Sequence, residues 1–241
     1  MSFTTWLSNL LGRSKKAEIE EFILPTSTSE IGTYEKAFEQ AIRFTNSCGF
    51  KEAPITWLEK DLTNKEGDFL AAVVKMSSVE EFSPSAGQCL KWCHYFAPYF
   101  ERHFGCRVMT TIGQLWSDEN KVYSPTWDEL RIWCAEGFRP ENYREGRIGF
   151  NLHSWLTLES GEIIDLTFFS TLAKVYPDLY GKVNGGVVYG RDPNVIPKHR
   201  YFPMAVGQDF VQAIADKTDI QVLASNPSEL EMISAGLYVM R

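Results

Sequence analysis

The stretch Ser85-Ala86-Gly87-Gln88-Cys89-Leu90-Lys91-Trp92 decides the fold of this chain, because it sets a cysteine directly after a glycine turn. From Cys89 to Gly105, apolar residues recur three and four positions apart, which is typical of the buried face of an α-helix. A thiol in the first helical turn lies near unpaired amides and the positive end of the helix dipole, and both favour the reactive thiolate. The stretch therefore predicts a helix that begins at a nucleophilic cysteine. Pro98 should kink or divide this helix, because proline lacks an amide donor.

Residues 153–165 read as a β-hairpin, with alternating strand residues on both sides of Glu159-Ser160-Gly161. If those three residues form the loop, with Gly161 in the left-handed conformation, Trp155 pairs with Asp165. His153 and Asp165 then lie diagonally on one face, at a separation that an imidazole and a carboxylate can bridge. A two-residue loop would instead turn Asp165 to the opposite face. The prediction of a site therefore depends on the register of this hairpin.

Together, Cys89, His153 and Asp165 make the ordered set of a cysteine enzyme: a thiolate, an imidazole base and a carboxylate that fixes the imidazole tautomer. Each residue alone has a simpler interpretation, as a buried structural cysteine or as a satisfied polar residue at a sheet surface. The shared face of His153 and Asp165 favours the catalytic interpretation.

Two further features of the site follow from its chemistry. The backbone amide of Cys89 is predicted to be one oxyanion donor, and Gln88 or Gln114 is a candidate for the second. Trp155 either packs in the core or forms the wall of a channel for the acyl group.

The five cysteines are odd in number and lack a framework spacing, which indicates a reducing compartment. Cys93 stands one turn after Cys89 and is expected to face the core. With His94, these two cysteines make a poor set for tetrahedral zinc. We therefore predict no metal site, and no cofactor.

Composition limits the remaining classes of function. The net charge of -7 and the lack of a long Lys/Arg run argue against a nucleic-acid partner. No apolar run approaches the ~20 residues of a membrane span, and Met1 to Lys16 lacks the pattern of a signal peptide. We expect a cytoplasmic protein with a protein or peptide substrate; export without a cleaved signal remains compatible with the sequence. No pattern assigns an oligomeric state.

The order of predicted elements indicates an α+β fold of one domain, residues 31–241, with 44% hydrophobic residues for its core. Residues 1–30 are predicted to form a short amphipathic helix followed by a linker. The helix either docks on the domain surface or binds a partner or a membrane surface, and any membrane contact would use this segment. The expected helices cover Thr33 to Phe50, Phe69 to Met76 (or a buried segment), Gln208 to Asp216 and a start at Asn226; the expected strands cover Cys106 to Ile112 and Ile148 to Leu158, and a Gly185-Gly186 turn precedes Val187.

This arrangement resembles the core of the transglutaminase-like superfamily of papain-fold cysteine enzymes. The resemblance rests on Gly87-x-Cys89, an apolar helix ending at Gly105, a strand from Arg107, His153-x-Trp155 and Asp165-Leu166-Thr167. It covers residues 87–167, about a third of the chain. It implies a papain-like core, with the nucleophile at a helix N-terminus packed on an antiparallel sheet. It also implies that Cys89 is the nucleophile, His153 the base and Asp165 the orienting acid.

The chain departs from the superfamily pattern at three places. A small residue is usual where Cys93 stands, a longer Gly-Ile-Pro-Ala-Arg-like sequence is usual at Gly105-Cys106-Arg107, and proline is usual at Leu166. None of these changes removes a catalytic group, so the resemblance implies a distant member.

The predicted function is attack on an amide or peptide carbonyl through a thioester, either as a hydrolase (protease or glutamine deamidase) or as a transglutaminase-type acyltransferase. A rival prediction is an inactive papain-fold module that binds a protein through an aromatic surface around Trp116, Tyr123, Trp127 and Trp133. A third is a secreted effector that modifies host proteins.

Overall fold

The computed structural model describes residues 22–63, 69–139, 150–192 and 195–232. The helix predicted near the N-terminus lies outside the described residues. The described part of the predicted linker packs on the domain instead of standing apart from it. Phe22 meets Phe44 edge to face at 5.3 Å between ring centroids, and the backbone amide of Thr28 donates to Glu119 at 3.0 Å.

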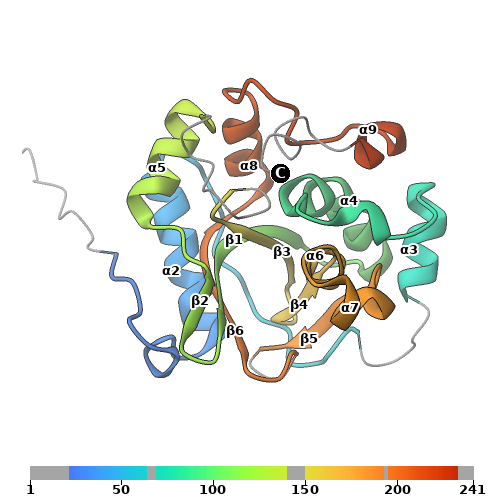
Figure 1. The fold of residues 1–241 in the computed structure, drawn as a ribbon. Coiled ribbons are helices and arrows are strands. Elements are labelled where there is room, and N and C mark those ends of the chain that lie inside the picture. The colour runs from blue at the N-terminus through green and yellow to red at the C-terminus, as the bar shows by residue number, and fades with distance from the viewer. Residues whose placement is uncertain (1–21, 64–68, 140–149, 193–194, 233–241) are drawn as a thin grey trace, which may run out of the picture.

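The chain folds as a mixed α+β domain, so the predicted class and the antiparallel sheet are confirmed (Figure 1). The helices are α2 (Tyr34–Ser47), α3 (Phe69–Ser77), α4 (Cys89–Phe104), α5 (Trp127–Glu136), α6 (Phe168–Val175), α7 (Pro177–Tyr180), α8 (Gln208–Ala215) and α9 (Pro227–Glu231), with 3-10 turns η1 (Thr28–Glu30), η2 (Ser83–Ser85) and η4 (Gly181–Val183). The strands are β1 (Val108–Ser117), β2 (Asn120–Tyr123), β3 (His153–Leu158), β4 (Glu162–Asp165), β5 (Val188–Arg191) and β6 (His199–Val206).

Strand β1 organises the sheet, in which every recorded pairing is antiparallel. Residues 108–113 of β1 pair with β3, residues 115–117 with β2, and residues 111–117 with β6. The residues of β1 that pair with β6 include residues that also pair with β2 or β3. Strand β6 must therefore lie along the opposite edge of β1. Strands β4 and β5 continue the sheet beyond β3. The sequence predicted β1 only as far as Ile112; the structure extends it to Ser117, where two neighbours pair with it.

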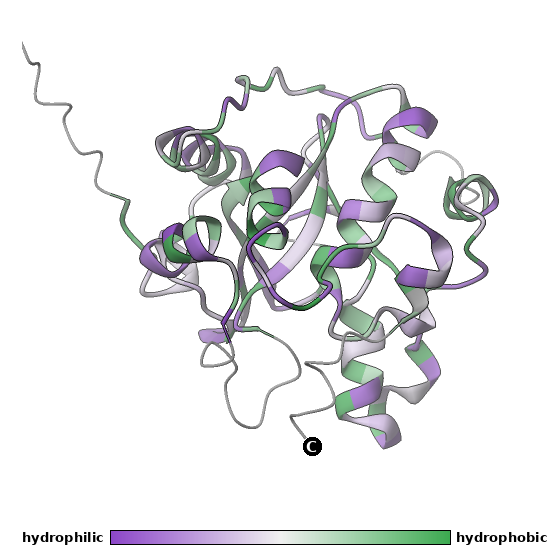
Figure 2. Ribbon diagram, turned by 90° about the horizontal axis from the view of Figure 1, so that it is seen from above, coloured by the Kyte–Doolittle hydropathy of each residue, from purple (hydrophilic) through white to green (hydrophobic). Residues whose placement is uncertain are grey.

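Both faces of the sheet are covered by helices, and the helices carry hydrophilic and hydrophobic residues side by side (Figure 2). Helix α2 packs on one face with Trp155, Ile163 and Tyr201. Helices α3 and α4 pack on the other face with Leu156 and Ile164. This alternation along β3 and β4 was predicted from the hairpin, and it is confirmed.

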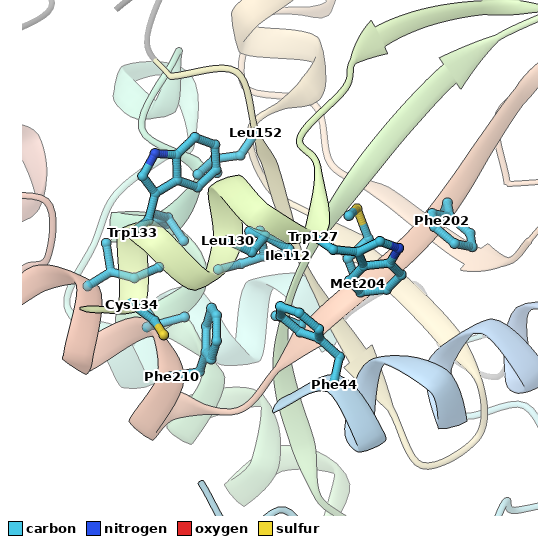
Figure 3. Close-up of a cluster of buried hydrophobic side chains, with 14 of the residues drawn as sticks. Phe44, Ile112, Trp127, Leu130, Trp133, Cys134, Leu152, Phe202, Met204 and Phe210 are labelled. Carbon is cyan, nitrogen blue, oxygen red and sulfur yellow. The ribbon is translucent and has the colours of Figure 1, made fainter. Parts of the chain in front are cut away.

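A third cluster joins α5 and α8 to the β1–β6 edge of the sheet (Figure 3). It buries the three tryptophans that the rival prediction placed on a binding surface. Trp116, Trp127 and Trp133 are between 1% and 4% exposed. The prediction of an aromatic binding surface is therefore wrong. The sequence did not predict α5, and this helix carries two of the tryptophans into the core.

Helix α4 begins at Cys89 and ends at Gly105, which has a left-handed φ of 65°. Of the two expected effects of Pro98, a kink or a division, the division is wrong, since the helix runs through it. Pro98 faces solvent, so water can reach the carbonyl that loses its helical partner. In the first turn, the buried Lys91 donates from Nζ to the backbone oxygens of Glu229 at 3.3 Å and Met232 at 2.7 Å. The first turn of α4 is thereby fastened to the last described residues.

The hairpin has the predicted register. Leu156 pairs with Ile164 and Thr157 with Ile163, which leaves residues 159–161 as the loop. Gly161 adopts a φ of 78°, in the left-handed region that the three-residue loop requires. The first strand is shorter than predicted, because β3 begins at His153.

Candidate active site

Cys89 is presented by a tight turn that is tied to the far end of the hairpin. Gly87 has a φ of 72°, and its amide donates to Thr171 Oγ1 of α6 at 3.1 Å. One turn earlier, Ser85 Oγ donates to the backbone oxygen of Leu166 at 2.9 Å. These two bonds fix the start of α4 against the segment that follows Asp165. Cys89 itself is partly exposed, as a nucleophile must be.

His153 is the first residue of β3, and its imidazole is buried between the thiol and a carboxylate. Its Nε2 lies 2.5 Å from Asp165 Oδ2, and the nearby Cys89 thiol is one of the groups that raise the pKa of the ring. Because Nε2 is occupied by Asp165, Nδ1 is the nitrogen left for the thiol. His153 is 2% exposed and Asp165 is fully buried. The structure therefore brings the three predicted residues together: His153 is hydrogen bonded to Asp165 and lies beside the partly exposed Cys89.

Asp165 accepts hydrogen bonds from five donors, one of which is the Thr167 hydroxyl at 3.4 Å from Oδ1. Its Oδ2 accepts from His153 and from the Tyr201 hydroxyl of β6, the latter at 2.9 Å. Its Oδ1 accepts from the amides of Thr167 at 3.0 Å and Phe168 at 3.1 Å, at the start of α6. Such an arrangement holds the carboxylate in one orientation and favours its ionised form.

The charges of His153 and Asp165 support each other. Burial opposes the imidazolium, but the charge and hydrogen bond of Asp165, with a smaller part from Cys89, raise the pKa of His153 to about 10. Burial likewise opposes the carboxylate, but the charge and hydrogen bond of His153, with the donors Thr167 and Tyr201, lower the pKa of Asp165. The pair is thus an imidazolium beside a carboxylate at neutral pH.

Aromatic rings hold the imidazole in place. Tyr123 stacks on His153, with 5.1 Å between ring centroids and 11° between planes. Trp155 and Tyr201 pack at 5.9 and 6.1 Å from the same ring. Trp155 is fully buried and donates from Nε1 to the Tyr34 hydroxyl at 2.7 Å. It is a core residue, so the channel-wall alternative is wrong.

The two candidate oxyanion side chains are engaged elsewhere. Gln114 donates from Nε2 to the Pro125 carbonyl at 2.9 Å, and its Oε1 accepts from the Trp116 indole at 3.0 Å. Gln88 donates from Nε2 to the Pro84 carbonyl at 3.0 Å. The sequence suggested both side chains as oxyanion donors because it does not reveal these hydrogen-bond partners. The Cys89 amide, in the first turn of α4, remains the donor that helix geometry leaves without an intrahelical acceptor.

Cys93 is buried one turn behind Cys89, as predicted. Burial, together with the nearby Cys89 and Asp165, raises the pKa of the Cys93 thiol well above its usual range. A buried thiol of this kind is inert, so the two cysteines of α4 have different roles.

Tyr201 and Tyr123 are the residues of the site that the sequence did not reveal. Tyr201 comes from a strand that was not predicted, and Tyr123 from a four-residue strand, β2. A β-strand pattern around residue 201 is the signal that could have predicted a buried tyrosine. The contact of this tyrosine with Asp165 could not be predicted, because it depends on the pairing of β6 with β1.

Among the described residues, no group of three or more His, Cys, Asp or Glu is arranged to hold a metal ion. No described helix has the length and apolar character that crossing a membrane requires. Comparison of the chain with protein-family models, curated proteins and solved structures found no match. The chemistry of the site is therefore inferred from its own geometry.

Proposed function

We propose that this chain is a cysteine-nucleophile enzyme with a papain-like core, which attacks amide or peptide carbonyls through a thioester. The observation that carries the proposal is the chain of three neighbouring residues from the partly exposed Cys89, through the buried His153, to the buried Asp165 that is hydrogen bonded to His153. A structural cysteine needs no such chain, whereas an activated thiol does.

In the proposed reaction, the His153 imidazolium stabilises the Cys89 thiolate, and the thiolate attacks the carbonyl carbon. The oxyanion that forms accepts a hydrogen bond from the Cys89 amide. His153 then gives its proton to the leaving nitrogen, the carbon–nitrogen bond breaks, and a thioester with Cys89 remains. Asp165 keeps the imidazole oriented throughout.

The second half-reaction defines the product. His153, now neutral, takes a proton from water or from an amine, which attacks the thioester and frees the thiol. Water gives a protease or a glutamine deamidase, and an amine gives a transglutaminase. We favour hydrolysis, because it requires no binding site for a second substrate.

A burst experiment tests the proposal. An activated ester should release one equivalent of leaving group rapidly from the wild type, with the acyl group on Cys89 by mass spectrometry. Cys89→Ala should abolish the burst, whereas Cys106→Ala, which removes another partly exposed thiol, should retain it. Equal acylation of Cys48, Cys89 and Cys106 without a burst would refute the proposal.

A second experiment, which compares two proteomes, identifies the substrate and the acceptor. Proteomes of cells expressing the wild type or Cys89→Ala should differ in cleaved, deamidated or cross-linked proteins, and each modification identifies a different acceptor or donor.

A further inference from the structure

A cavity of about 350 Å³ lies beside the turn that presents Cys89. Its walls come from residues 83–86, from α6 and from residues 181–184. Ligand pockets generally span roughly 300–1,000 Å³, so this cavity suits one or two side chains of a larger molecule.

The cavity is close to the nucleophile. Ala86 lines it, and Cys89 follows three residues later, a span of at most about 10 Å along the backbone. The opposite wall is α6, and it is tied to the turn before Cys89. Thr171 Oγ1 of this helix accepts a hydrogen bond from the Gly87 amide at 3.1 Å. A side chain in the cavity would therefore belong to a substrate whose reacting carbonyl is within a residue or two.

The lining is largely apolar and has one cation. Pro84, Ala86 and Ala173 supply apolar wall. The hydroxyl of Ser170 is already used, since it donates to the Phe82 carbonyl and accepts from the Gly185 amide, both at 3.1 Å. Lys174 brings a positive charge, and no carboxylate is among the lining residues. In a chain of net charge -7, this is a local site for an acidic group.

An exposed apolar surface continues from the cavity. Half of the large hydrophobic residues that are exposed in the described chain fall in residues 175–183: Val175, Tyr176, Leu179, Tyr180 and Val183. Leu179 is 76% exposed. Contiguous exposed apolar residues in a soluble domain mark interaction sites.

We propose that the cavity and residues 175–183 dock a polypeptide substrate, with an aliphatic side chain in the cavity and a neighbouring carboxylate at Lys174. The apolar wall of the cavity suits the aliphatic side chain, Lys174 suits the carboxylate, and the exposed residues 175–183 suit the rest of the polypeptide. This inference rests on the proposed function, because it names the substrate class of the Cys89 site.

Three probes with one reactive group test it: iodoacetyl-Leu-Asp, iodoacetyl-Leu-Lys and iodoacetyl-Gly-Gly, with iodoacetamide as the reference. The rate of Cys89 alkylation is measured by mass spectrometry. Relative to iodoacetamide, we expect Leu-Asp to react at least ten-fold faster than Gly-Gly, with Leu-Lys between them.

Three variants locate the effect. Ala173→Trp fills the cavity and should reduce the Leu-Asp rate to that of Gly-Gly, without changing the iodoacetamide rate. Because Ala173 is buried and its variant has to fold, Leu179→Asp at the exposed surface gives an independent test and should slow both leucine probes. Lys174→Glu should reverse the preference for Leu-Asp over Leu-Lys, whereas its matched control, Lys182→Glu, should not.

The outcomes separate the two proposals. If every probe keeps the same relative rate in all variants while Cys89 remains the preferred thiol, the docking site is wrong and the proposed function stands. If no probe prefers Cys89 to Cys48 and Cys106, the proposed function fails as well.

Discussion

Strand β4 carries a buried carboxylate at each end, and the two have different surroundings. Glu162 accepts from the amides of Leu62 at 2.5 Å and Thr63 at 3.1 Å, and from the hydroxyls of Thr63 and Ser160. Asp165 also accepts amides and a hydroxyl, but one of its donors is the imidazole of His153. Both carboxylates are fully buried.

The comparison shows that burial and a full set of hydrogen bonds do not identify a catalytic carboxylate. Glu162 binds neutral groups, and these bonds fasten residues 62–63 to the hairpin. Asp165 binds a group that can carry a proton, and that group lies near a thiol. The titratable partner is what distinguishes Asp165 from Glu162 and what the proposed function requires.

The largest difference should appear in acylation. Asp165→Asn removes the charge that orients and stabilises the imidazolium, so the rate of the burst should fall by roughly 10³ to 10⁴-fold, as for the corresponding change in serine enzymes. Glu162→Gln should leave the burst rate of the folded protein within a few-fold. Stopped-flow burst kinetics check both, with circular dichroism as the control for folding. Equal loss in the two variants would show that Asp165 has only a structural role.

Stability against pH should separate the same two positions. The pKa of His153 is raised to about 10 from an ordinary 6.5, so its ion pair stabilises the fold fully below about pH 6.5, and this contribution is lost as the pH rises through about 10. The free energy of unfolding of the wild type and Glu162→Gln should therefore fall over this interval. His153→Gln and Asp165→Asn should show a flatter profile in urea titrations, and profiles parallel to the wild type would contradict the assigned ionisation.

Glu162→Gln should lower stability at neutral pH by about 1–3 kcal/mol. The amide nitrogen of glutamine would face a donor where a carboxylate oxygen now accepts, so one buried donor on Leu62, Thr63 or Ser160 loses its partner. Urea unfolding measures the loss. An unchanged midpoint and slope would mean that these bonds add nothing net to the fold.

Tyr201→Phe should have the smallest effect, about 1–2 kcal/mol of stability. Tyr201 is one of the donors that lower the pKa of Asp165, and a lowered carboxyl pKa stabilises the fold above the ordinary 3.8, until the pH falls through the folded value. Without the hydroxyl, the acid loss of stability should begin at a higher pH. Acid titration followed by tryptophan fluorescence tests this, and an unmoved midpoint would remove Tyr201 from the site.

The sequence was informative where chemistry and periodicity act locally. Gly161 fixes a three-residue loop because it tolerates a positive φ, and the loop determines the register that joins His153 to Asp165. The stripe after Cys89 predicted α4 to within a residue. Local pattern cannot show which partner a strand will find, and so Tyr201 was missed.

Contacts between distant or unpredicted segments also explain the wrong predictions. The tryptophans of α5 became core residues because α8 packs on the same side, and Gln114 became a core hydrogen-bonding residue because Pro125 lies above it. Helix α8 is distant from α5 in the sequence, and Pro125 lies outside the elements that the sequence predicted.

The bond from Lys91 to Met232 has a consequence for synthesis on the ribosome. Helix α4 is made before these partners, yet its first turn is fastened by residues 229–232, and Asp165 is held by Tyr201 of β6. A growing chain therefore carries Cys89 long before the residues that hold α4 and Asp165 in place have been made. Alkylation of Cys89 in stalled chains that end before His199 should accordingly lack the preference that we expect for residues 1–241.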